Sequence, residues 1–197
     1  MTRKEIFINS AFTDNAVWKQ ILGICSSLAV TNLMMNSLIM GLGVTFALAL
    51  SCLTVSIIRE YTPRSVRMIA QTLIMAAYVI MVDIMLKAFL PDVSKQLGPY
   101  VGLIITNCIL MGRLEAFASK NPPLDSVIDG IGAGLGYTMV LLVISFVREL
   151  FGFGTLFGFK IFGSWWTNWS IMVMAPSAFF LLALLIWFVN NKYYKVV

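Results

Sequence analysis

The pentapeptide "GLGVT" (residues 41–45) recurs almost unchanged as "GLGYT" (residues 134–138), each time inside a long apolar run. Both runs end in Arg-Glu, at residues 59–60 and 148–149. In each half of the chain the apolar runs also follow one order, which is short, long, long. This echo predicts two copies of a three-helix unit, and three crossings per unit place the two copies in opposite orientations in a membrane.

The composition indicates whether this chain lies in water or in a membrane. Of its 197 residues 59% are hydrophobic and only 12% are charged, with a mean hydropathy of +0.89. A soluble domain carries about 25% charged residues, so we expect an integral membrane protein. The start of the chain lacks the charged and then apolar pattern of a signal peptide. At about 20 apolar residues per crossing, the chain has room for about six helices in one transmembrane domain, residues 1–197.

Six apolar runs fill most of the chain, and the first and fourth are short. We expect an all-α integral membrane protein with six transmembrane helices, over about residues 21–35, 38–58, 68–90, 97–112, 127–147 and 171–189. The inverted repeats would be residues 16–95 and 96–190. About 15 residues of helix span only about 22 Å, less than the hydrocarbon thickness of about 30 Å. We therefore expect helices one and four to be short or broken. The residues that make such breaks feasible are Gly23, Gly98, Pro99, Gly102 and Gly112.

The basic residues predict the orientation of the chain, because six crossings put both termini on one side. Ten of them lie on the side of the termini: Arg3, Lys4, Lys19, Arg59, Arg64, Arg67, Arg113, Lys120, Lys192 and Lys195. The opposite side holds Lys87, Lys95, Arg148 and Lys160. By the positive-inside rule both termini are expected in the cytoplasm. Basic residues spaced in this way are orientation signals, so we expect a lipid bilayer and no nucleic acid as partner.

Cysteines are the candidate functional residues, because the chain has no histidine and only three cysteines. Cys25 and Cys108 each lie in one of the two short runs, at matching places in the repeat. Cys52 has no counterpart, and we interpret it as a small packing residue, which is the alternative for the other two as well. Soft sulfur ligands select iron–sulfur clusters, zinc or copper(I). A cluster needs about four cysteines, so it would be shared with another polypeptide, most simply a homologous one.

Seven stretches carry a family resemblance: "LGICSSLAVT", "SVRMIAQ", "LKAFLPDVSKQL", "VGLIITNCILMGRLEAFA", "DGIGAGLGYT", "FVRELFGFGTLFG" and "MAPSAFFLLALLIW". They resemble the family of D-type subunits of the sodium-translocating NADH:quinone oxidoreductase (Nqr), which is homologous to membrane subunits of the Rnf ferredoxin:NAD oxidoreductase. The resemblance covers nearly the whole chain, and "VGLIITNC" favours Nqr over Rnf. One departure is Leu114, where the family more often has alanine.

The resemblance implies both a partner and a cofactor. The partner is the paralogous E-type subunit of Nqr, in opposite orientation, within a complex that also holds the A, B, C and F subunits in the bacterial cytoplasmic (inner) membrane. The cofactor is an iron–sulfur cluster, 2Fe-2S in type, held by Cys25, Cys108 and two cysteines of the partner. Flavins and quinone would belong to other subunits, and no catalytic residue is expected here. Amides at a helix break, with Ser26, Thr106 or Asn107, could donate hydrogen bonds to cluster sulfurs and raise the reduction potential.

Two alternative functions also fit a chain of this kind. The alternatives are the equivalent E-type subunit of an Rnf complex and, from a different class, an inverted-repeat solute transporter, for which the long runs offer few polar groups.

Asp83 and Lys87 predict a local ion pair, with a place on a sodium path as the alternative. The Arg-Glu pairs at residues 59–60 and 148–149 predict anchors at the membrane interface. Trp165, Trp166 and Trp169 are typical of an aromatic belt.

Overall fold

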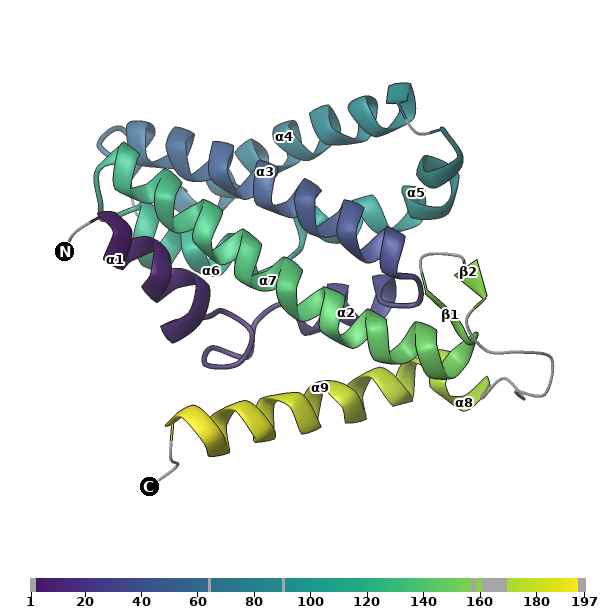
Figure 1. The fold of residues 1–197 in the computed structure, drawn as a ribbon. Coiled ribbons are helices and arrows are strands. Elements are labelled where there is room, and N and C mark those ends of the chain that lie inside the picture. The colour runs from purple at the N-terminus through teal and green to yellow at the C-terminus, as the bar shows by residue number, and fades with distance from the viewer. Residues whose placement is uncertain (1–2, 64, 90, 157–158, 161–169, 195–197) are drawn as a thin grey trace.

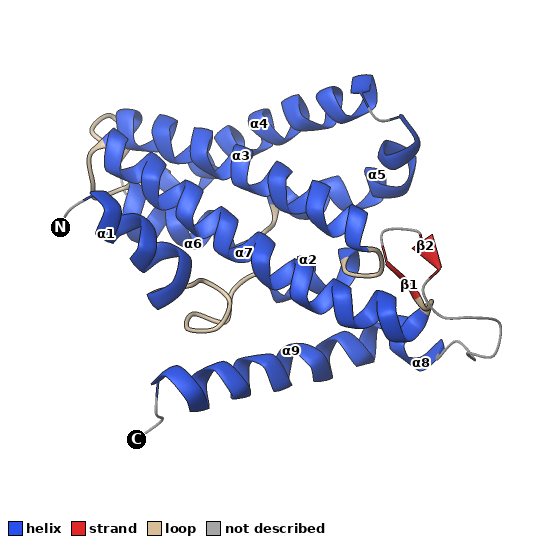
Figure 2. Cartoon of the chain, in the orientation of Figure 1, coloured by secondary structure: helices blue, strands red, loops and turns tan. Residues whose placement is uncertain are grey.

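The structure is a computed structural model that describes residues 3–63, 65–89, 91–156, 159–160 and 170–194 (Figure 1). Its elements in chain order are α1 (Arg3–Ile8), η1 (Asn9–Thr13), α2 (Ile24–Val30), α3 (Met34–Ile58), α4 (Arg67–Phe89), α5 (Pro91–Ile105), α6 (Cys108–Arg113), η2 (Leu114–Ala118), α7 (Pro123–Gly152), β1 (Thr155–Leu156), β2 (Phe159–Lys160), α8 (Ser170–Val173), α9 (Ala175–Val189) and η3 (Asn190–Tyr194). Apart from the small antiparallel hairpin β1–β2, the regular structure of the described residues is helical (Figure 2).

Helices α3 and α7 form the centre of the fold and lie side by side (Figure 1). They cross at the two repeated pentapeptides. A Cβ atom added to Gly41 would lie 2.6 Å from Thr138 Cγ2, and one added to Gly134 would lie 2.7 Å from Thr45 Cα. Each threonine hydroxyl donates to the glycine carbonyl four residues earlier, at 2.8 Å in both helices. The contact is reciprocal, as between two copies related by a twofold axis, so the sequence echo marks one close crossing of helices.

Four helical stretches are long and apolar enough to cross a membrane, at Met34–Ile58, Arg67–Phe89, Tyr100–Ala118 and Pro123–Gly152. The segment Pro176–Lys192 is apolar but shorter. Large apolar side chains on α4 and α9, such as Leu73 and Phe180, are 73% and 72% exposed in the isolated chain. Exposed apolar faces of this kind suit contact with lipid or with other membrane subunits.

The first and fourth predicted runs are interrupted. The first contributes only the seven-residue helix α2, and the fourth is divided between α5 and α6. A break ends at Gly23, as predicted, because this residue has a φ of 80° and directly precedes α2. Gly98, Pro99 and Gly102 lie inside helix α5, and Gly112 lies inside α6, so the prediction of breaks at these residues is wrong.

The N-terminal segment packs inside the fold, which the sequence did not indicate. Ser10 and Asn15 are buried, and the Ser10 hydroxyl donates to the carbonyl of Asp129 at 3.0 Å. Glycines on α7 let the segment approach closely: a Cβ added to Gly136 would lie 2.7 Å from the carbonyl oxygen of Ala11. The elements α1 and η1 therefore belong to the bundle and lie against the first half of α7.

The prediction that Arg148 and Glu149 are interfacial anchors is wrong, because they are only 2% and 1% exposed. Their charged groups find partners within the chain, which removes the need for water. Asp83 and Lys87 form the predicted local ion pair on α4. Trp165, Trp166 and Trp169, predicted to form an aromatic belt, lie outside the described residues.

Candidate functional site

Both cysteines of the short runs lie in the first turn of a short helix that follows a break. Cys25 is the second residue of α2, and Cys108 is the first residue of α6. Asn107 ends the second break in an extended conformation, with φ −68° and ψ 120°, and its side chain accepts a hydrogen bond from the Ile109 N–H. An asparagine in this position is a favoured helix N-cap, so the sequence "TNC" is a helix stop followed by a helix start.

Hydrogen bonds join the two breaks. Asn107 Nδ2 donates to Ser26 Oγ at 3.2 Å, and Ser26 Oγ lies 2.6 Å from the Tyr137 hydroxyl and 3.2 Å from the Gly23 carbonyl. One proton assignment satisfies every group. Asn107 and Tyr137 donate to the serine oxygen, and the serine hydroxyl donates to the carbonyl of Gly23. The residue after Cys25 is thereby tied to the residue before Cys108.

Packing holds the same junction. A Cβ added to Gly23 would lie 2.5 Å from Ile109 Cδ1 and 3.2 Å from Tyr137 Cε2. Ile109 and Tyr137 are both fully buried. Only glycine combines the positive φ of this position with so close an approach. The starts of α2 and α6 are therefore held against each other and against the middle of α7.

The far ends of the two short helices are each tied down by a buried arginine. Arg148 donates to the hydroxyl of Thr31, just after α2, at 2.7 Å and to the carbonyl of Val173, at the end of α8, at 2.8 Å. Arg113 closes α6 and donates to the carbonyl of Asp14 at 2.8 Å, and its Nη1 lies 3.6 Å from Asp129 Oδ1. A buried guanidinium with several acceptors fixes the backbone around it.

Next to Arg148 a carboxylate organises the junction between α2 and α3. Glu149 accepts a hydrogen bond from the Met34 N–H, the first residue of α3, at 2.7 Å. A carboxylate at a helix N-terminus satisfies a free backbone donor and interacts favourably with the helix dipole. The end of α7 thus positions α2, α3 and α8 together. The sequence had indicated a place at the membrane surface for both Arg148 and Glu149.

The three cysteines differ in environment. Cys25 is exposed, Cys108 is partly buried, and Cys52 is buried in α3 against α7. Within the described residues no three histidine, cysteine, aspartate or glutamate side chains are placed to hold a metal ion. A site with four sulfur ligands would take two thiols from this chain, and N–H groups in a first turn have no partner within their helix. Such a site would need its other ligands from another chain.

The sequence did not indicate the role of Tyr137, and it indicated a different role for Asn107. The sequence predicts that Asn107 donates to a cofactor, whereas the described hydrogen bonds of its side chain join it to Ser26 and to the Ile109 N–H. Its position between a polar residue and an apolar helix was an available signal for a cap. Tyr137 lies within the echoed pentapeptide, and no local pattern indicates its contact with Ser26.

Residues 3–186 match a family described as "Rnf-Nqr subunit, membrane protein". The chain is 50% identical over 191 residues to a protein of Pseudomonas aeruginosa (strain LESB58) named as the D subunit of the Na(+)-translocating NADH-quinone reductase, covering 94% of this chain and 85% of that protein. A protein of the same name from Yersinia enterocolitica serotype O:8 / biotype 1B (strain NCTC 13174 / 8081) is 49% identical over 189 residues, covering 93% of this chain and 90% of the relative.

Proposed function

Because this chain belongs to the Rnf-Nqr subunit family of membrane proteins, we propose that it is a membrane electron-transfer subunit of a sodium-translocating NADH:quinone reductase. It is part of an enzyme complex and has no independent active site. The relatives named as D subunits favour this assignment over the E-type subunit of an Rnf complex. A solute transporter built on the same plan is the less favoured alternative, because the relatives described above are named as subunits of a reductase.

The observation that supports the electron-transfer role is the joined pair of helix starts. Cys25 and Cys108 flank the bond between Ser26 and Asn107, and a cysteine pair without any histidine suits an iron–sulfur cluster. When bound, such a cluster takes up and releases a single electron. Cys25 and Cys108 would hold the cluster through their thiolates. The packing of Gly23 against Ile109 and Tyr137 holds the two helix starts together.

The remaining cluster ligands are proposed to come from the paralogous E-type subunit of the same complex, in opposite orientation. The exposure of Cys25 in the isolated chain supports a ligand that reaches across an interface. A 2Fe-2S cluster with two cysteines from each partner fits the two thiols offered here. The A, B, C and F subunits complete the proposed complex, and its flavins and quinone belong to those subunits.

The proposed topology is six crossings in two inverted repeats, within the cytoplasmic (inner) membrane of a bacterium and with both termini in the cytoplasm. The reciprocal crossing of α3 and α7 at the two pentapeptides supports the repeat. So does the parallel between its halves, in which a break and a short cysteine-bearing helix precede each long central helix. The shorter α8–α9 segment would be the sixth crossing.

The test replaces each cysteine by alanine in the purified complex. Cys25→Ala and Cys108→Ala should each lower the iron content and abolish NADH-driven quinone reduction, because each removes one ligand. Cys52→Ala is the matched control, since Cys52 is buried elsewhere in α3, and it should keep both properties. Unchanged iron and unchanged electron transfer in the first two variants would refute the proposal.

A further inference from the structure

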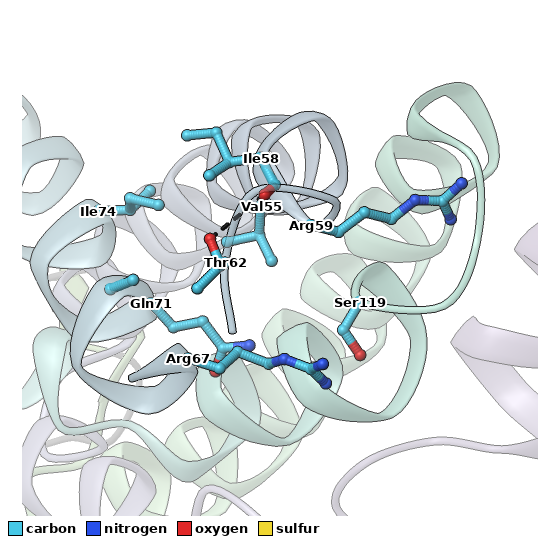
Figure 3. Close-up of a pocket in the computed structure, with 9 residues that line it drawn as sticks. Val55, Ile58, Arg59, Thr62, Arg67, Gln71, Ile74 and Ser119 are labelled. Carbon is cyan, nitrogen blue, oxygen red and sulfur yellow. Dashed lines mark hydrogen bonds between the residues drawn. The ribbon is translucent and has the colours of Figure 1, made fainter. Parts of the chain in front are cut away.

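Two adjoining cavities open where α3 ends and α4 begins. The first is lined by Val55, Ile58, Arg59, Thr62, Arg67, Ala70, Gln71, Ile74 and Ser119. The second, with a volume of about 460 Å³, is lined by Arg67, Met68, Glu115, Ser119 and Lys120. The first is narrow, with a volume of about 20 Å³, and it shares Arg67 and Ser119 with the second. We call the two together the α3–α4 depression. Figure 3 shows Arg59 and Arg67 extending from the two helix ends toward the turn that carries Ser119.

The polar side of the α3–α4 depression is cationic. Arg59, Arg67 and Lys120 line it, and Glu115 is the one carboxylate among the residues described as lining either cavity. That carboxylate is already occupied, because Arg67 Nη1 lies 3.2 Å from Glu115 Oε1 and Gln71 donates to its other oxygen at 3.1 Å. Arg67 has further N–H donors besides the one used. The depression therefore has an excess of positive charge and free donors.

The other side of the depression is apolar and continues into the face of α4. Val55, Ile58 and Ile74 form its wall. Along α4, Ile69 and Leu73 are 70% and 73% exposed. These side chains belong to helices long and apolar enough to span a membrane. A ligand that fits both sides carries a negative head and an apolar tail.

We propose that the α3–α4 depression binds the headgroup of an anionic phospholipid, with the phosphate held by Arg59, Arg67 and Lys120 and an acyl chain along α4. Basic pockets between transmembrane helices bind such headgroups on the cytoplasmic side of a membrane. The positive-inside rule assigns this end of α3 and α4 to that side. The site lies apart from the cysteines and does not depend on the proposed electron-transfer role.

Native mass spectrometry of the detergent-purified complex, titrated with phosphatidylglycerol, measures this binding. Each basic residue near a headgroup contributes enough that its loss weakens binding about fivefold. Arg59→Gln and Lys120→Gln should each raise the Kd for one phosphatidylglycerol by about that factor. Arg59→Lys keeps the charge and should stay closer to the parent. Lys87→Gln is the matched control, because Lys87 is exposed at the other end of α4, and it should leave the Kd unchanged.

Two competitors separate lipid from other anions. Phosphatidylcholine with the same acyl chains has the same phosphate but no net charge, so it should bind more weakly than phosphatidylglycerol and lose less affinity on Arg59→Gln. Millimolar inorganic phosphate should leave phosphatidylglycerol bound. The proposal fails if Arg59→Gln and Lys120→Gln bind phosphatidylglycerol like the parent, or if Lys87→Gln weakens binding equally. It fails also if phosphatidylcholine shows the same sensitivity, or if inorganic phosphate displaces the lipid and so identifies a site for free phosphate.

Discussion

Replacement of Asn107 by leucine tests the junction between the two short helices, because leucine has nearly the same size and no polar atoms. The variant loses the N-cap of α6, where Asn107 Oδ1 accepts from the Ile109 N–H at 3.2 Å, and the 3.2 Å bond to Ser26. Loss of a cap costs about 1 kcal/mol, and a lost hydrogen bond costs about 1 kcal/mol more. The expected destabilisation is about 2 kcal/mol.

Thermal unfolding of the purified complex at a fixed scan rate measures this loss. About 2 kcal/mol would lower the Tm of a single domain of this size by about 4–8 °C, and the larger complex should show a smaller shift in the same direction. Asn32→Leu is the matched control. The side-chain oxygen of Asn32 is buried without a hydrogen-bond partner, so its removal should lower the apparent Tm by less than Asn107→Leu does.

A double-mutant cycle with Ser26→Ala isolates the bond itself. Because Asn107 and Ser26 share one hydrogen bond, the double variant should lose about 1 kcal/mol less than the sum of the single losses. Additivity of the two losses, or an Asn107→Leu variant as stable as Asn32→Leu, would refute the reasoning that Asn107 joins the two breaks.

Three further predictions rest on separate contacts. Gly134→Ala should destabilise the complex by about 1–3 kcal/mol in the same melting assay, because its new Cβ would meet the α3 backbone at 2.7 Å; Gly98→Ala, with no neighbour within 4 Å, should not. Arg148→Met should cost about 3–5 kcal/mol or prevent accumulation in the membrane, since it orphans several buried acceptors; normal accumulation and melting would contradict this. In the chain isolated from its complex, a maleimide should label the exposed Cys25 rapidly and Cys52 only after unfolding; equal rates would contradict the structure.

The two pentapeptides predicted a repeat from the sequence, but not that they would meet at one close crossing of helices. In "GLGVT" and "GLGYT", small residues permit close approach and each threonine satisfies its own helix. The break at Gly23 was predicted from local sequence, because the positive φ at this position favours glycine. The breaks near Gly98 and Gly112 were predicted wrongly, because a glycine inside a helix only weakens it. The observed break occurs at Asn107, whose cap stops one helix and starts the next.

The buried charges could not be predicted from local sequence. Arg148 depends on acceptors at Thr31 and Val173, which lie 117 and 25 residues away in the chain. Glu149 depends on the free N–H at the start of α3, 115 residues away. A charged pair at the end of an apolar run looks the same whether it faces water or a set of buried backbone groups. Only the packing of α2 and α8 around the end of α7 distinguishes the two.

The proposal that Cys25 and Cys108 ligate one iron–sulfur cluster is tested most directly by electron paramagnetic resonance of the reduced complex. Cys25→Ser and Cys108→Ser replace sulfur by oxygen at a ligand position, so each should shift the g-values or remove the signal. Cys52→Ser should leave the spectrum of the parent complex unchanged. Spectra of Cys25→Ser and Cys108→Ser that coincide with the parent spectrum, at full iron content, would contradict the proposed ligands.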